Sequence, residues 1–294
     1  MAESCFGEGV DAERLDREAF KFRHTLLGHP ALSLENLARV IPALPKESVM
    51  YSKGLLKNGD DFETTFSKRP EHRSIEETIE NIRVSDSYIM VSSPERDASF
   101  APLKKQLLAD VEALMRTRGV GNVAVDPKLF LFIASPNSVT PFHLDRYSTF
   151  LLQFRGSKQV SVFSPWDERV VSAPTCEAYV AYQSTRLPWT EDMDCLATRF
   201  DFRPGDALHI PFVAGHHVRN GGEDVSISMS IIFNTRESQA WRGALNFNHR
   251  SRRILRRVGM SPAPVGTNPW RDGAKAHVWS AVAGAAKKLK AVQD

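Results

Sequence analysis

The sequence has few cysteines, and it lacks both a long apolar run and a basic leader. Cys5, Cys176 and Cys195 are widely spaced and form no Cys-x-x-Cys pair, which argues against a disulfide framework and a structural zinc site. No stretch approaches the roughly 20 apolar residues of a membrane-spanning helix. The first segment, residues 1–14, is acidic and does not resemble a secretory leader. We therefore expect a cytoplasmic protein with no membrane partner.

Net charge is also low, but it is unevenly distributed along the chain. The total is +3, yet residues 236–294 carry twelve Lys or Arg against three acidic residues, a balance of +9. Such a tail can contact an acidic partner, but basic tails more often form solvated surface or pack on acidic neighbours. We expect no nucleic-acid partner.

The chain is long enough for one large domain with additions, because 294 residues with 42 % hydrophobic content can bury a sizeable core. Residues 1–125 are expected to be mainly helical and to pack on the domain that follows. Apolar residues recur at helical spacing over 34–41 and over 103–115. A capping box formed by Ser74 and Glu77 predicts a further short helix after them.

From residue 126 onward the sequence changes to short β-rich runs separated by Pro, Gly and Asn, which is typical of an antiparallel barrel or sandwich. The runs are 129–134, 150–155, 159–163, 207–210 and 225–233. In the last run, apolar residues alternate with Ser226, Ser228 and Ser230, so one strand face is small and polar. That face indicates a solvated cavity. We predict a mainly β barrel over 126–236 and a basic, helical extension over 237–294.

Two short motifs carry candidate metal ligands. His143 and Asp145 are two positions apart at the end of a strand-like segment, so both side chains can point to one face and reach one ion. His216 follows a second strand that a proline ends. Two histidines and one carboxylate leave open positions on an octahedral ion, which suits Fe(II) oxygen chemistry better than closed zinc coordination. Neighbouring strand residues face opposite sides, so His217, like His209, is expected to support the site or the core.

Together these segments resemble the double-stranded β-helix 2-oxoglutarate oxygenases of the cupin-like JmjC group. The nearest pattern is that of the asparaginyl hydroxylases known as factor inhibiting HIF: Thr-Pro-x-His-x-Asp, then an aromatic strand, then Lys-Gly-x-Lys. The chain has Thr140-Pro141-Phe142-His143-Leu144-Asp145, then Phe150, then Arg155-Gly156-Ser157-Lys158. The similarity covers residues 129–233 and implies a cupin or jelly-roll barrel.

The resemblance implies a ligand set and a co-substrate site. His143, Asp145 and His216 would bind Fe(II), while Lys158, assisted by the hydroxyl of Thr140, would bind the distal carboxylate of 2-oxoglutarate. A dianion that chelates iron through its keto-acid end needs a fixed cation and hydroxyl donors at its far end.

The sequence departs from the pattern of these relatives near the predicted iron. Ala214 and Gly215 stand where relatives have an aromatic pair, and Ser230 replaces a polar amide. We expect these changes to leave more room beside the metal.

The expected activity is therefore a 2-oxoglutarate-dependent hydroxylation of an unidentified substrate, either a protein side chain or a small molecule. Two alternatives stay open. One is a metal-dependent cupin that does not use 2-oxoglutarate, and the other is a non-catalytic cupin that senses a small molecule or docks a partner. Because relatives often dimerise through helices that follow the barrel, the resemblance also implies a homodimer through residues 237–294.

Overall fold

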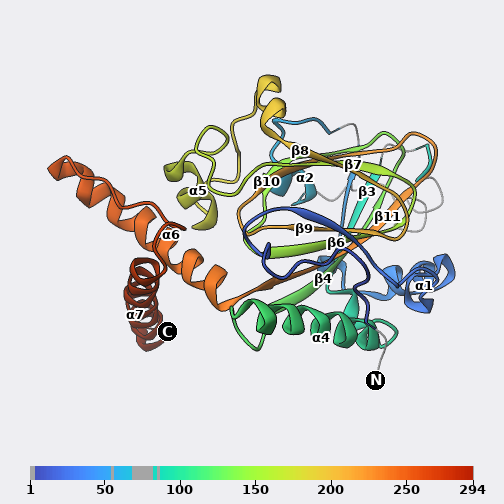
Figure 1. Cartoon of the computed structure of the whole chain (residues 1–294), viewed down its shortest axis with the longest axis horizontal. Helices are drawn as coiled ribbons and strands as arrows, with labels where there is room; N and C mark the ends of the chain where they lie inside the picture. The colour runs from blue at the N-terminus through green and yellow to red at the C-terminus, as the bar shows by residue number, and fades with distance from the viewer. Residues whose placement is uncertain (1–3, 54–55, 68–81, 85–86, 294) are drawn as a thin grey trace.

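The computed structural model describes residues 4–53, 56–67, 82–84 and 87–293. Its centre is a barrel built from two antiparallel sheets (Figure 1). The larger sheet has seven strands in the order β1-β9-β6-β11-β4-β3-β2, and the smaller has four in the order β5-β10-β7-β8. The predicted fold, a mainly β jelly-roll barrel with flanking helices, is confirmed.

The strands of the larger sheet are β1 (Phe20–Arg23), β2 (Val49–Lys53), β3 (Ser87–Ser92), β4 (Val125–Ala134), β6 (Ser148–Arg155), β9 (Asp206–Ile210) and β11 (Ser226–Asn234). Those of the smaller sheet are β5 (Val139–Leu144), β7 (Lys158–Val162), β8 (Thr198–Phe202) and β10 (Gly215–Asn220). The α-helices are α1 (Leu34–Ala43), α2 (Phe62–Ser67), α4 (Ala101–Arg118), α5 (Ala173–Val180), α6 (Arg236–Leu255) and α7 (Pro269–Gln293).

The N-terminal part of the chain contributes strands to the larger sheet as well as helices. β1 pairs with β9, while β2 and β3 extend the sheet beyond β4 at its other edge. The prediction that residues 1–125 are mainly helical missed these three strands. They are short, and their pairing partners are distant in sequence, so local pattern carries little signal for them. The helices predicted over 34–41 and 103–115 correspond to α1 and α4, and the one predicted after Ser74 lies outside the described residues.

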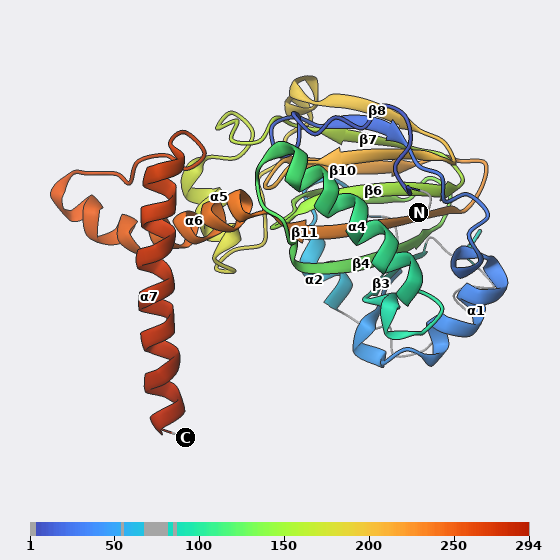
Figure 2. The same ribbon diagram turned by 60° about the horizontal axis from the view of Figure 1, so that its bottom comes forward.

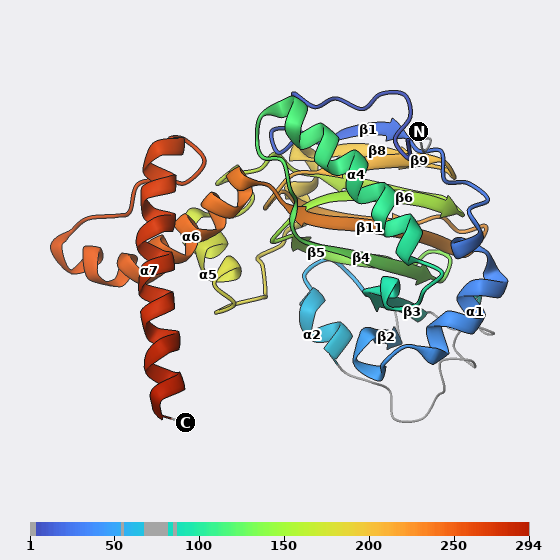
Figure 3. The same ribbon diagram turned by 90° about the horizontal axis from the view of Figure 1, so that it is seen from below.

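Helix α4 lies across the outer face of the larger sheet (Figure 3). Its buried Leu107 and Val111 belong to the same hydrophobic core as Ile227 and Met229 of β11. Full burial of each such side chain stabilises the fold by roughly 1.5–3 kcal/mol. Because the apolar face of β11 is turned outward to α4, the serine face of the same strand is turned into the barrel.

Helices α6 and α7 pack against each other at one end of the barrel, and α7 extends well away from it (Figure 2). The side chain of Thr235 caps α6 by accepting from the backbone N–H of Ser238, and Trp241 and Leu245 bury the helix against α5 and the barrel end. Within the described residues, no helix combines the length and apolar character that a membrane crossing needs.

Candidate metal centre

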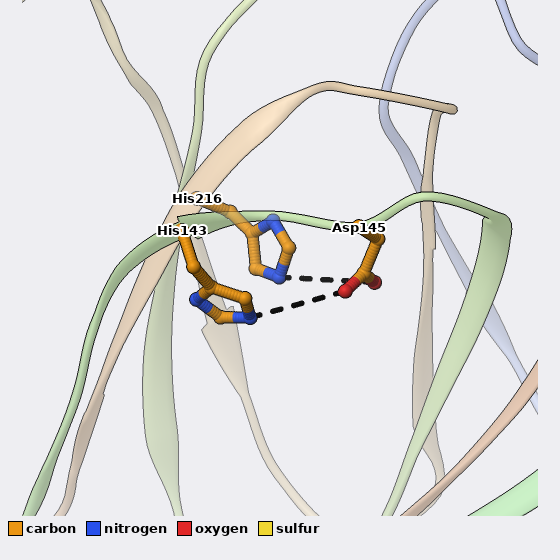
Figure 4. Close-up of side chains that lie close together, drawn as sticks. All are labelled: His143, Asp145 and His216. Carbon is orange, nitrogen blue, oxygen red and sulfur yellow. Dashed lines mark ion pairs between the residues drawn. The ribbon is translucent and has the colours of Figure 1, made fainter. Parts of the chain in front are cut away.

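The two strands that carry the candidate ligands are direct neighbours. β5 and β10 pair antiparallel with His143 opposite His216, and the two imidazole rings lie 4.1 Å apart. Asp145 follows β5 at once. Its Oδ1 lies 3.9 Å from Nε2 of His143 and its Oδ2 lies 3.9 Å from Nε2 of His216 (Figure 4). One donor atom from each of the three side chains lies within 4.8 Å of the others, so the three surround a common point.

Backbone carbonyls orient both imidazoles toward that point. Nδ1 of His143 is 2.8 Å from the carbonyl oxygen of Pro141, and Nδ1 of His216 is 3.0 Å from that of Ala214. A carbonyl only accepts, so each Nδ1 carries the proton and each neutral ring offers the lone pair of Nε2. Burial and the adjacent His216 also lower the pKa of His143 to about 3, which keeps this ring neutral.

The carboxylate of Asp145 is held as well. The hydroxyl of Thr149 donates to Oδ2 at 2.6 Å, and the N–H of Val213 donates to the backbone carbonyl of Asp145 at 3.1 Å. Two imidazole nitrogens and one carboxylate oxygen form a donor set for a divalent first-row transition metal, with positions left over. The residues present therefore fit such an ion.

The three side chains line a cavity of about 210 Å³ between the two sheets. Lys158, at the start of β7, reaches across this cavity and donates to the hydroxyl of Ser228 on β11 at 2.8 Å. Thr140 lines the same cavity and donates to the hydroxyl of Tyr88 at 3.2 Å. The structure thus brings all five residues that the sequence singled out into one cavity.

Lys158 is an unusual lysine because only 7 % of it is exposed. Burial lowers its pKa to about 7. Among the described residues no carboxylate forms an ion pair with it. A buried ammonium without a counter-ion is costly, so an anion that enters the cavity would be strongly favoured beside it.

The neighbouring histidines lie elsewhere. His217 points away from the cavity and contacts Asp194 at 2.8 Å. His209 is fully buried and accepts the backbone N–H of Asp16 at 2.9 Å.

The expectation that Ala214 and Gly215 leave room beside the metal is wrong. Neither residue lines the cavity. A Cβ added to Gly215 would lie 2.7 Å from the ring of Phe142, so this aromatic ring already occupies the space. Ser230 does line the cavity, as the alternation in its strand predicted.

Sequence reasoning missed several residues that hold the centre in place. Thr149 orients Asp145, and Tyr88 contacts Thr140. Neither carries a local motif, since the first is one threonine in an apolar strand and the second comes from the unpredicted strand β3.

The chain belongs to the cupin-like domain family, whose model matches residues 46–239. This match begins far upstream of residue 126, in keeping with the strands that the N-terminal part adds to the larger sheet. No curated protein sequence matches the chain.

Solved structures of two kinds are similar to it. The ribosomal oxygenase YcfD from Escherichia coli, in complex with cobalt and 2-oxoglutarate, is 13 % identical with a TM-score of 0.46, over 87 % of this chain and 57 % of that one. The oxalate decarboxylase of Lactobacillus farciminis, in a formate complex, is 19 % identical with a TM-score of 0.26, over 41 % of this chain and 27 % of that one. The chain therefore spans about a quarter of that decarboxylase and under two thirds of that YcfD chain.

Proposed function

We propose that the chain is an Fe(II)- and 2-oxoglutarate-dependent oxygenase that hydroxylates a substrate at a C–H bond. Its metal ligands would be His143, Asp145 and His216. The observation that carries this proposal is the position of Lys158: a buried cation without a described carboxylate partner shares one cavity with a two-histidine, one-carboxylate cluster. Membership of the cupin-like family supports the same reading.

The residues of the cavity would have different roles in binding. Lys158 and the hydroxyl of Ser228 would bind the distal carboxylate of 2-oxoglutarate, with the hydroxyls of Thr140 and Tyr88 as further polar contacts. A charge-assisted contact of this kind is about twice as strong as a neutral hydrogen bond. We infer that the keto-acid end of the molecule would then face the three ligands.

When bound, Fe(II) would supply the oxygen chemistry that amino-acid side chains lack. Apolar walls formed by Leu151, Ile210 and Val218 would keep water from the reacting groups. Tyr182 lines the same cavity and is 58 % exposed, so the substrate would enter past this residue. No side chain is required as a general base.

Anaerobic absorption spectroscopy tests the proposal. Protein loaded with Fe(II) and 2-oxoglutarate should show a weak visible charge-transfer band, and Lys158→Met should lose the band while its metal content stays unchanged. Metal-loaded wild type without the band would contradict 2-oxoglutarate use and favour a cupin that acts directly on its substrate. Wild type that takes up neither Fe, Mn, Co nor Zn would favour a non-catalytic binding module.

We also propose a homodimer formed through α6 and α7. Helix α7 extends away from the barrel (Figure 2), and its Trp270, Val278 and Val282 are 84 %, 47 % and 56 % exposed. Exposed apolar side chains on one projecting helix suit a second copy of the chain. Light scattering after gel filtration should give the dimer mass, and a paired change, Val278→Asp with Val282→Asp, should give the monomer. Monomeric wild type would contradict this proposal.

A further inference from the structure

Strand β5 carries one proposed ligand, His143, and leads directly into another, Asp145, yet it is an edge strand. Within the described part of the chain it pairs with β10 alone, at the end of the four-stranded sheet. The outer edge of such a strand has backbone groups without a strand partner and yields more easily than a central strand. Two of the three ligands therefore depend on what covers this edge.

Residues 58–63, which run into the first turn of α2, cover it, and we call them the clasp. The side-chain oxygen of Asn58 accepts the backbone N–H of Phe142 at 3.1 Å, in place of a neighbouring strand. A second hydrogen bond holds the clasp on its other side, where the hydroxyl of Thr185 donates to the carboxylate of Asp61 at 2.7 Å. Helix α2 accordingly lies next to β5 (Figure 3).

The next contact of the clasp is with the ligand itself. The ring of Phe62 stacks on the imidazole of His143 with centroids 4.1 Å apart and an interplanar angle of 18°. That imidazole also contacts the ring of His216, with centroids likewise 4.1 Å apart but an interplanar angle of 53°. His143 thus contacts two rings, and the stacked ring of Phe62 limits its rotation and excludes water from one face.

The last contact reaches the residue beside the carboxylate ligand. Glu63 forms an ion pair with Arg146, which directly follows Asp145 and is 7 % exposed. The guanidinium of Arg146 also donates to the carbonyl of Tyr179 at 2.6 and 2.9 Å, and it lies between the rings of Tyr179 and Tyr182, at 4.0 and 3.9 Å. Removal of Glu63 would leave the buried guanidinium without this carboxylate, so the chain next to Asp145 would be held less firmly.

We propose that the clasp is a positioning element, which holds His143 and Asp145 in the geometry of metal ligands and slows the departure of the ion. Its three contacts fall on β5 and the residues that follow it: Asn58 on residue 142, Phe62 on residue 143 and Glu63 on residue 146. The inference rests on the proposed metal site. Partners that orient a ligand without touching the metal commonly change metal affinity by about 10–100-fold when they are removed.

The test uses Co(II) on the full-length protein, followed by its visible spectrum and by its release to excess chelator. Phe62→Leu and Glu63→Gln should each speed Co(II) release about tenfold or more and alter the shape of the spectrum. Because both changes act through one element, the double variant should release Co(II) more slowly than the product of the two single effects predicts. Arg39→Met is the matched control, since Arg39, on α1, forms an exposed ion pair with Asp97 and its loss should leave release unchanged.

The outcomes distinguish failure of the clasp proposal from failure of the proposed metal site. Wild type that binds no Co(II) would overturn the proposed ligands. Wild type that binds Co(II), with clasp variants releasing it within twofold of Arg39→Met, would overturn the clasp alone. Circular dichroism checks that the variants fold. If one of them does not fold, Asn58→Ala replaces it, because this change removes one hydrogen bond at a half-buried position.

Discussion

The ammonium of Lys158 lies 2.8 Å from the hydroxyl of Ser228, so a cation on the four-stranded sheet is bound by a group of the seven-stranded sheet across the cavity. This contact joins β7 to β11 through two polar side chains that line the same cavity. An anion in the cavity would bind beside this contact, because the hydrogen bond to Ser228 holds the ammonium there.

Binding of 2-oxoglutarate should depend on pH through Lys158. Burial lowers the pKa of this lysine to about 7, so the free protein loses the ammonium as the pH rises through that value. A dianion requires the charged form. The dissociation constant should therefore be nearly flat below pH 7 and should rise up to about tenfold per pH unit above it.

Calorimetric titration with Mn(II) present measures this dependence. Lys158→Met should bind 2-oxoglutarate roughly 10- to 150-fold more weakly at pH 6.5, from the loss of about 1.5–3 kcal/mol for a charged hydrogen bond, and should show no such rise. Affinity that improves between pH 7 and pH 9 in the wild type would contradict the role of this lysine.

Metal binding should distinguish two adjacent histidines. His216→Ala removes a nitrogen that faces Asp145 and should reduce Co(II) affinity by at least about 100-fold, since one of three protein donors is lost. His217→Ala is the matched control, because His217 points to Asp194 outside the cavity. Titration of each variant with Co(II) gives the comparison. Equal losses in both would show that the second ligand motif has been misassigned.

Asp16 should make the folded state less stable as pH rises from 4 to 6. This carboxyl is buried and accepts from the N–H of Phe212 and the hydroxyl of Ser148, yet burial raises its pKa from 3.8 to about 6. In that window the native carboxyl keeps a proton that the unfolded chain has released, so the free energy of unfolding falls as the pH rises. Two pKa units correspond to roughly 3 kcal/mol.

Urea unfolding of wild type and Asp16→Asn isolates this effect from that of other carboxyls, such as Asp97, whose pKa is lowered chiefly by its hydrogen bond with Arg39. The stability of the wild type relative to the variant should decline by up to about 3 kcal/mol between pH 4 and pH 6. A difference that stays constant over this range would argue against a raised pKa.

Substitution of Gly156 should reduce the free energy of unfolding more than substitution of a glycine with a similar backbone conformation elsewhere. It sits in the β6–β7 turn with φ of +66°, and a Cβ there would lie 2.5 Å from the carbonyl oxygen of Val225. Gly28 has φ of +78° but open space around it. Gly28→Ala should cost about 1–2 kcal/mol from backbone strain alone. Gly156→Ala should cost clearly more in urea unfolding, and it should weaken 2-oxoglutarate binding because Lys158 follows this turn. Similar costs for both would refute the close contact.

Local rules predicted that His143 and Asp145 share a face and that His216 starts a strand, while the family resemblance implied that the three side chains converge. Strand residues two apart share a face, and the glycine and proline that bracket the second motif place His216 at the start of a strand. The serine alternation of β11 likewise predicted a polar face, and Ser228 and Ser230 do line the cavity.

The sequence could not predict side-chain contacts between segments that are distant along the chain. Phe62 and Glu63 lie in a polar stretch with no motif, and they reach His143 and Arg146 only because the chain folds back over the edge of β5. The prediction of free space beside Gly215 was wrong for the same reason, since the ring of Phe142, which fills that space, belongs to another strand. Side-chain packing between strands is decided by register, which local composition does not encode.

The strands donated by the N-terminal part have a practical consequence for how the protein can be shortened. A version that began at residue 126 would remove β1 and β3, the partners of β9 and β4, together with α4. Both margins of the larger sheet would then present bare backbone donors and acceptors, and the leucines of β4 would face water. Such a fragment should aggregate by strand-to-strand addition, so β1 and β3 are part of the barrel's own closure.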